Sequence, residues 1–164
     1  MTHIEQLENI ISSHRQIAII SHFNPDGDAI GSTLAIHHLI KSLGKNSTPI
    51  LPSPYPSYLS FAEGEQEIII FEGNEDKVAK CLESADLIFC VDFNKFSRTE
   101  GMAPLIKAAS GAKVLIDHHI GPDLEEFDLA FSEPSASSTC ELIFWILMKS
   151  KFALGNTSMF PSEA

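Results

Sequence analysis

The chain has 164 residues, of which 44% are hydrophobic, and its formal net charge is −11. This length and this share of apolar residues fit one soluble domain with a single packed core. The acidic balance excludes sequence-independent binding to duplex nucleic acid, which requires clustered Lys and Arg against the phosphates. Clustered carboxylates can still accept a phosphate ligand when they hold divalent cations, because the ions reverse the local field.

Targeting signals and disulfide patterns are missing from the sequence. No apolar run approaches the roughly 20 residues of a membrane-spanning helix, and the N-terminus lacks the basic start and apolar centre of a signal peptide. We therefore expect a cytoplasmic protein with no membrane contact. Cys81, Cys90 and Cys140 have no Cys-x-x-Cys spacing, which favours reduced, buried thiols over a disulfide framework or a structural zinc site.

Hydrophobic periodicity predicts helices that alternate with strands. In chain order we expect a helix at 4–13, a strand at 16–21, a helix at 29–43, strands at 48–51 and 67–71, a helix at 75–85, a strand at 86–92, a helix at 101–110, strands at 113–116 and 127–131, and a helix at 138–149. Gly44 is expected to cap the second helix, and prolines at 52–56 predict an irregular connector. This alternation predicts an α/β fold with a mainly parallel sheet and helices on both faces.

A polar loop follows the first predicted strand. It carries His22, Asp26 and Asp28 within seven residues, next to turn-forming residues that cannot continue the strand. Asp28 could cap a helix that begins at Ala29, and Asn24 could close an Asx turn. Those local roles do not account for the histidine, so we interpret the loop as a metal site.

Two further strands end in the same kind of residue. The strand at 86–92 ends in Asp92, and the strand at 113–116 leads directly into Asp117, His118 and His119. Because parallel strands place their carboxyl ends at one edge of a sheet, we expect these residues to share a cleft with the first loop. Aspartate oxygens with imidazoles suit Mn²⁺, or Mg²⁺, Co²⁺ or Fe²⁺, and the ligands suffice for two ions. His37 and His38, well past the loop, are interpreted as ordinary helix residues.

The combined pattern resembles a known family. Its parts are His22-x-Asn24-x-Asp26-x-Asp28, Val91-Asp92 and Asp117-His118-His119, in this order along the chain. Order and spacing resemble the first three motifs of the DHH phosphoesterases, over essentially the whole chain. The stretch 137–143 resembles the branch of NrnA-type oligoribonucleases and phosphoadenosine phosphate phosphatases. The resemblance implies that residues 1–164 are the catalytic N-terminal DHH domain.

The resemblance also implies a role for each matching residue. His22 and Asp26 would bind one Mn²⁺, Asp28 and His118 would bind the other, and Asp92 would bridge the two. Asp117 would orient the turn or a neighbouring histidine. His119 would lie near the scissile phosphate, and Asn24 would position a ligand or the nucleophile. Mg²⁺ or Co²⁺ could replace Mn²⁺. Arg98 is a candidate contact for a terminal phosphate, although its plainer interpretation is an exposed residue at a helix start.

Two parts of the family pattern are not found in the sequence. The family has a fourth metal-binding aspartate in an Asp-Thr-Gly turn, and nothing from 149 to 164 matches it. The smaller DHH-associated C-terminal domain, which holds the substrate, is absent as well. We therefore expect a fragment of a two-domain parent, incomplete at its C-terminal end and lacking part of the metal shell.

The function implied by the resemblance is Mn²⁺-dependent, two-metal hydrolysis of phosphate esters. The expected substrates are short single-stranded oligonucleotides, nucleoside 3′,5′-bisphosphates and linear or cyclic dinucleotides. An exopolyphosphatase or pyrophosphatase is the alternative within the same chemistry, and a metal-dependent nucleotide-binding module without catalysis is the alternative from another class. The expected partner is thus a small phosphorylated substrate rather than a duplex, and a homodimer is compatible with this function.

Overall fold

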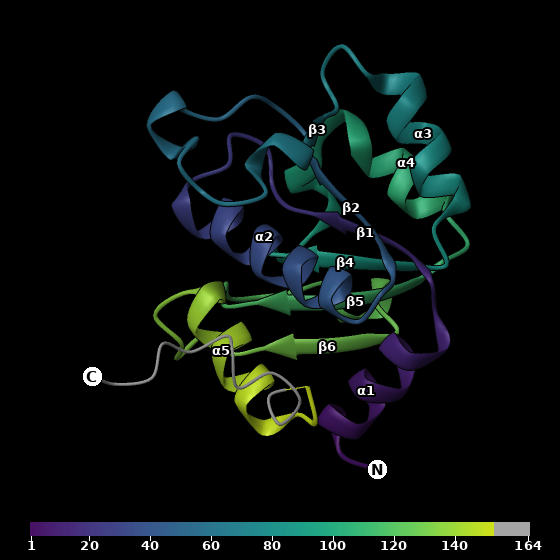
Figure 1. Cartoon of the computed structure of the whole chain (residues 1–164), viewed down its shortest axis with the longest axis vertical. Helices are drawn as coiled ribbons and strands as arrows, with labels where there is room; N and C mark the ends of the chain where they lie inside the picture. The colour runs from purple at the N-terminus through teal and green to yellow at the C-terminus, as the bar shows by residue number, and fades with distance from the viewer. Residues whose placement is uncertain (153–164) are drawn as a thin grey trace.

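The structure is a computed structural model, and it describes residues 1–152. A six-stranded sheet, in which all paired strands are parallel, forms its centre (Figure 1). The strand order is β3-β2-β1-β4-β5-β6. The chain therefore starts in the middle of the sheet, moves outward to β3, and then crosses to β4 on the other side of β1. The crossing point between β1 and β4 is where open α/β sheets bind ligands.

The elements follow the predicted alternation. The strands are β1 (Gln16–Ile20), β2 (Asn46–Leu51), β3 (Ile69–Ile70), β4 (Leu87–Val91), β5 (Ala112–Asp117) and β6 (Leu129–Ser132), and the α-helices are α1 (His3–Ser13), α2 (Gly27–Ser42), α3 (Glu75–Ser84), α4 (Ala103–Ala108) and α5 (Thr139–Lys149). Short 3-10 helices are η1 (Ser57–Leu59), η2 (Glu65–Glu67), η3 (Phe96–Met102) and η4 (Leu124–Glu126). The predicted α/β fold is confirmed.

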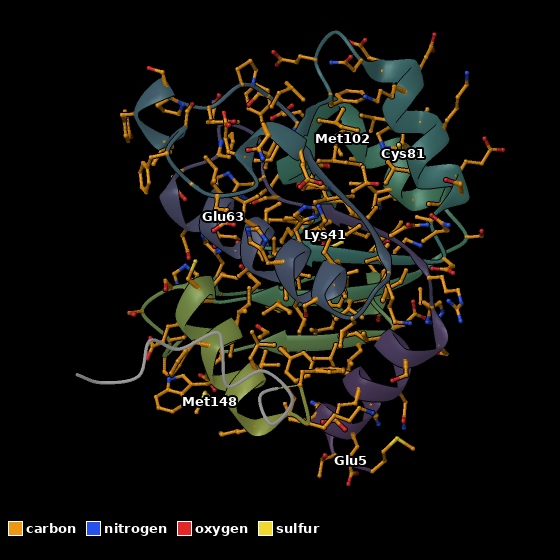
Figure 2. The ribbon with its side chains drawn as sticks, in the orientation of Figure 1. Glu5, Lys41, Glu63, Cys81, Met102 and Met148 are labelled. Carbon is orange, nitrogen blue, oxygen red and sulfur yellow. The ribbon has the colours of Figure 1, made fainter. Side chains whose placement is uncertain are left out.

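Two hydrophobic cores lie on opposite faces of the sheet. Ile17 and Ile19 of β1 point into the core under α1, α2 and α5, while Ala18 and Ile20 point into the core under α3, η3 and α4. Figure 2 labels Met102, which belongs to the second core. β4 is buried along its whole length because it lies between other strands and under helices on both faces. The predicted arrangement of helices on both faces is therefore confirmed.

Several elements differ from the prediction in extent, among them the following three. The strand expected at 67–71 shrinks to Ile69–Ile70, because Gly64 at φ +86° turns the chain into η2 just before it. The helix expected at 101–110 consists of the last two residues of η3 followed by α4, which ends at Ala108, and the chain kinks inside η3 at Glu100, which has φ 49°. The helix expected at 29–43 begins at Gly27, and Gly44 at φ +70° takes the left-handed conformation that ends helices, as predicted.

The remaining expectations concern membranes, thiols and the C-terminal segment. Within residues 1–152, no helix has the length and hydropathy required to cross a membrane. Cys81, Cys90 and Cys140 are free thiols, of which Cys90 is fully buried and the other two are half-buried. The segment 153–164, which covers most of the region where we looked for a fourth metal-binding aspartate, lies outside the described residues.

Candidate metal centre

The predicted site residues follow three strands that lie side by side in the sheet. β1 ends just before His22, β4 ends just before Asp92, and β5 ends at Asp117. β4 pairs with both β1 and β5, and all three strands run in the same direction. The structure therefore brings the three polar segments together at the carboxyl edge of the sheet.

Asp26 shapes the loop between β1 and α2. Its Oδ1 accepts hydrogen bonds from the backbone N–H groups of Asp28 and Ala29, at 2.9 and 3.0 Å, which makes it the N-cap of α2. The capping role that we considered for Asp28 thus belongs to Asp26. Asn24 has a left-handed φ of 53°, and its backbone N–H donates to Ser53 Oγ at 2.8 Å. Asn tolerates this conformation better than most residues, which accounts for the sharp turn before Asp26.

Asp92 lies at the centre of the site and is 2% exposed. Its Oδ2 is 3.5 Å from His22 Nε2, and its Oδ1 is 3.7 Å from His118 Nε2. The two oxygens of one carboxylate therefore face two different imidazoles. Asp92 also has a left-handed φ of 64°, and non-glycine residues in this conformation are concentrated at functional sites.

Both of these imidazoles are oriented by a backbone carbonyl. His22 Nδ1 is 2.8 Å from the Phe23 carbonyl oxygen, and His118 Nδ1 is 3.2 Å from the Ala136 carbonyl oxygen. With the proton on Nδ1, the Nε2 atoms keep their lone pairs and point toward Asp92. This is the usual arrangement of histidines that bind metal ions.

The negative charge around His22 raises the pKa of this residue. Burial lowers this pKa, but the hydrogen bonds to Asp92 and to the Phe23 carbonyl, with the charge of Asp92, outweigh burial and raise it above its ordinary value. A positive charge at His22 Nε2 is therefore favoured. A divalent cation beside Asp92 would be favoured by the same field.

Asp28 contacts the beginning of α5. Its Oδ2 accepts the backbone N–H of Thr139 at 2.7 Å, and its Oδ1 accepts that of Cys140 at 2.9 Å. Burial raises the pKa of Asp28, but the hydrogen bonds donated by Cys140 and Thr139 outweigh burial, so the pKa is lowered and the ionised carboxylate is favoured. Asp28 Oδ2 is also 3.8 Å from His118 Nε2, which leaves it available to an ion there.

Asp117 is fully buried behind His119. Its Oδ1 lies 2.7 Å from His119 Nδ1, and its Oδ2 accepts the backbone N–H of His119 at 3.1 Å. His119 Nδ1 is thereby engaged as a donor, although it is only 4.0 Å from Asp92 Oδ1. The ring is 33% exposed, so a ligand that approaches from solvent can reach it.

Arg98 lies in η3, beside the first loop. Its carbonyl oxygen accepts the backbone N–H of Phe23 at 2.8 Å, which fastens η3 to the loop that carries His22. Its positive charge is close enough to lower the pKa of His22, as the smallest of the contributions. Within residues 1–152, the half-buried guanidinium of Arg98 has no hydrogen bond or ion pair. A free guanidinium beside a metal centre can receive a phosphate.

One residue of the site was not predicted. Thr139, at the start of α5, donates from its hydroxyl to Asp92 Oδ1 at 2.8 Å, and both side chains are buried. The sequence contains a weak signal for it, because Ser138 and Glu141 have the spacing of a helix N-terminus, where backbone N–H groups are free to donate. That signal does not tell which acceptors these groups would meet.

The donor atoms form two adjacent groups. Ligand atoms of His22, Asp26 and Asp92 lie within 4.8 Å of one another, as do those of Asp92, His118 and His119. His119 Nδ1 is also engaged by Asp117, and Asp28 Oδ2 lies beside the second group, 3.8 Å from His118 Nε2. Carboxylate oxygens with imidazole nitrogens fit divalent ions such as Mn²⁺, Mg²⁺ or Co²⁺.

Known sequences resemble this chain over most of its length. The sequence model of the DHH family, N-terminal domain, matches residues 16–163. A bifunctional oligoribonuclease and PAP phosphatase NrnA from Thermus thermophilus is 32% identical over 127 residues, which are 77% of this chain and 35% of the relative. A protein of the same description from Mycoplasma genitalium is 29% identical over 151 residues, 92% of this chain and 45% of the relative. The chain therefore spans less than half the length of these relatives.

Solved structures show the same fold. An exopolyphosphatase-related protein from Bacteroides fragilis matches with a TM-score of 0.89 and 33% identity, over 92% of this chain and 44% of that chain. The exonuclease RecJ bound to manganese matches with a TM-score of 0.55 and 17% identity, over 94% of this chain and 39% of that chain, which is a likeness of fold alone. Since the family match extends over nearly the whole sequence and the three motifs meet at one edge of the sheet, the chain belongs to the DHH family and carries its N-terminal domain.

Proposed function

We propose that this chain is the catalytic domain of a divalent metal-dependent phosphohydrolase that cleaves phosphate esters of small nucleotides. The observation that carries the proposal is the placement of Asp92, with one oxygen toward His22 Nε2 and the other toward His118 Nε2. A carboxylate that faces two imidazoles in this way suits two neighbouring cations, the arrangement that recurs in enzymes of phosphate ester hydrolysis.

The ligand roles follow from the two donor groups. His22 and Asp26 would hold one ion, Asp28 and His118 the other, and Asp92 both. When bound, such ions supply an activated water molecule and neutralise phosphate oxygens. We propose Mn²⁺ as the metal, which is supported by the fold likeness to RecJ bound to manganese and by the oxygen and imidazole donors.

The remaining residues would act on the substrate. His119, held by Asp117, would donate from its outer nitrogen to a phosphate oxygen when protonated. Arg98 would receive a terminal phosphate with two parallel hydrogen bonds. Asn24, at the exposed turn, would contact the phosphate or the attacking water. Together these groups would orient the scissile ester against the two ions.

The proposed substrates are short single-stranded oligonucleotides, nucleoside 3′,5′-bisphosphates and dinucleotides. Support comes from the two relatives described as oligoribonuclease and PAP phosphatase, and the net charge of −11 disfavours duplexes. A polyphosphate substrate is the second candidate, which the likeness to the exopolyphosphatase-related protein favours. A nucleotide-binding module without catalysis is the third outcome that an experiment must separate.

The test combines metal binding with turnover. The purified chain is titrated with Mn²⁺ in a calorimeter and then incubated with adenosine 3′,5′-bisphosphate, a 5′-labelled diribonucleotide or inorganic polyphosphate. We expect Mn²⁺-dependent hydrolysis of the first two when this domain is joined to a DHH-associated C-terminal domain, and a fall of at least about 100-fold in Asp92→Asn, because the variant loses a shared ligand. Asp76→Asn, on the exposed surface of α3, is the matched control and should keep full activity.

Each other outcome has a definite meaning. Preferential cleavage of polyphosphate would move the assignment to the second candidate. Mn²⁺ binding with nucleotide binding but without turnover would favour the non-catalytic module. Asp92→Asn with wild-type hydrolysis would contradict the proposed metal centre altogether.

A further inference from the structure

The first turn of α5 contacts two carboxylates that come from different parts of the fold. The hydroxyl of Thr139 donates to Asp92 Oδ1 at 2.8 Å, and the backbone N–H of the same residue donates to Asp28 Oδ2 at 2.7 Å. The next N–H, that of Cys140, donates to Asp28 Oδ1 at 2.9 Å. One helix end therefore fixes a carboxylate of α2 relative to a carboxylate at the end of β4.

The hydroxyl contact determines which way Asp92 is turned. A carboxylate rotates easily about its last torsion, whose energy wells are broad. In Asp92, Oδ1 accepts the Thr139 hydroxyl and lies toward His118, while Oδ2 lies toward His22. Thr139 has no exposed surface and Asp92 is 2% exposed, so no water competes for this hydrogen bond.

We infer that Thr139 is a positioning residue, which holds Asp92 so that each of its oxygens faces one of the two ion positions. The inference rests on the proposed function, in which Asp92 is the shared ligand. Thr139 itself would touch neither ion nor substrate. It would act through Asp92 with its hydroxyl and through Asp28 with its backbone N–H.

Residues other than Thr139 make the side-chain hydrogen bonds that hold the first turn of α5. Ser138 caps the helix by accepting the backbone N–H of Glu141 at 3.0 Å, and Glu141 Oε2 accepts the backbone N–H of Ser137 at 2.8 Å. These two bonds hold the start of α5 without the Thr139 hydroxyl. Loss of the hydroxyl should therefore affect the metal centre more than it affects the helix.

The experiment makes the same substitution, of Thr by Val, at positions 139 and 33, and adds Thr139→Ser as the rescue variant. Thr139→Val removes the hydroxyl and keeps the shape of the side chain, and Thr139→Ser restores the hydroxyl. Thr33→Val is the matched control, because Thr33 is fully buried in α2 and its Oγ1 has no hydrogen-bond partner within the described residues. Each variant is titrated with Mn²⁺ alone by calorimetry, after its folding has been checked by circular dichroism.

We expect Thr139→Val to bind Mn²⁺ about 10-fold more weakly than the wild type, as is usual when a group that orients a metal ligand is removed. Thr139→Ser should recover most of the affinity, and Thr33→Val should not differ from the wild type. Wild-type affinity in Thr139→Val would overturn the inference, and so would an equal loss in Thr33→Val.

A failure of the proposed function would give a different result. In that case the wild-type chain itself would bind no Mn²⁺, and crystal structures of the metal-free wild type and Thr139→Val would decide on Thr139 alone. An Asp92 carboxylate that turns away from its place in the variant supports the positioning role. An Asp92 carboxylate that stays in place overturns it.

Discussion

His119 is fastened to Asp117 by both its ring and its backbone. The ring Nδ1 is 2.7 Å from Asp117 Oδ1, and the backbone N–H donates to Oδ2 at 3.1 Å. Because Asp117 has no exposed surface, it fixes the direction of the His119 ring from behind. The direction of the His119 ring is therefore set by Asp117.

Asp117→Asn should reduce turnover without a comparable loss of metal binding. The amide keeps one oxygen acceptor, so one of the two bonds to His119 is lost. We expect kcat to fall by about 10-fold or more, while the Mn²⁺ affinity changes by less than about threefold. Steady-state kinetics and calorimetry check this. The opposite pattern, weaker Mn²⁺ binding with unchanged kcat, would identify Asp117 as a metal ligand instead.

Arg98→Gln should weaken substrate binding. A hydrogen bond to a charged group contributes about 1.5–3 kcal/mol, so KM for adenosine 3′,5′-bisphosphate should rise by about 10-fold or more. Mn²⁺ affinity should stay at the wild-type value. Lys95→Gln is the control, because Lys95 is an exposed cation in the same segment and its Nζ is 3.8 Å from Asp123 Oδ1. An equal rise in KM for both variants would indicate a general charge effect rather than a contact with Arg98.

Gly31→Ala should destabilise the protein and disturb the metal centre. A Cβ at Gly31 would lie 2.8 Å from Cys140 Sγ, closer than real Cβ atoms approach other atoms. The new methyl group would push α2 and α5 apart, and overpacking of this kind costs about 1–3 kcal/mol. Denaturant unfolding measures the loss, and Mn²⁺ calorimetry should show weaker binding because Cys140 N–H donates to Asp28.

The double variant Gly31→Ala, Cys140→Ala provides the internal check. Removal of the sulfur makes room for the new methyl group, so the double variant should recover stability relative to Gly31→Ala alone. A double-mutant cycle that gives no coupling between the two sites would contradict the contact.

His37 should make the stability depend on pH. Its side chain has no exposed surface, its Nδ1 is 2.9 Å from Ser47 Oγ, and its Nε2 is 3.4 Å from Glu67 Oε2. Burial lowers the pKa of His37 below its ordinary value of 6.5, and the nearby Glu67 offsets this only in part, while Lys41, labelled in Figure 2, and His38 lower it further. The folded protein therefore binds this proton less readily than the unfolded chain.

The sign of the effect follows from this difference. The contribution of neutral His37 to the free energy of unfolding is complete above pH 6.5 and is lost as the pH falls through the lowered pKa. We expect the stability difference between the wild type and His37→Asn to shrink between pH 7 and pH 5. The pKa of His22 is raised, so its contribution to the free energy of unfolding falls as the pH rises. For this reason the prediction concerns the difference in stability between the wild type and His37→Asn, not the stability of the wild type alone. A difference that is constant over this range would contradict the prediction.

Much of the fold could be predicted because each strand is a short apolar run and most helices have a regular stripe. Residues at the strand ends, such as Asp92 and Asp117, could be placed at one edge because parallel strands share their direction. The extent of β3 could not be predicted from the sequence. The apolar run at 68–70 has strand character throughout, but only Ile69 and Ile70 pair with β2. The turn at Gly64 and the short helix η2, which come directly before β3, delay the start of the strand.

The contacts of the site could not be predicted beyond its motifs. Asp28 and Thr139 are 111 residues apart, and no local pattern relates them. Their contact arises because α2 and α5 cross at Gly31, where the absence of a side chain lets Cys140 approach. The contact between α2 and α5 also explains why Asp26 caps α2 and Asp28 does not. Both oxygens of the Asp28 carboxylate accept hydrogen bonds from α5.

The position of α5 in the chain also bears on the order of biosynthesis. β1 to β6 all precede Thr139, whereas Asp28 belongs to the first loop and helix after β1. On the ribosome, the strands can therefore emerge before the donors for Asp28 and Asp92 exist. A nascent chain that stops before residue 139 would contain all six strands of the sheet and leave both carboxylates without these donors. The hydrogen bonds from α5 to Asp28 and Asp92 therefore form only after α5 has been made and has docked on α2.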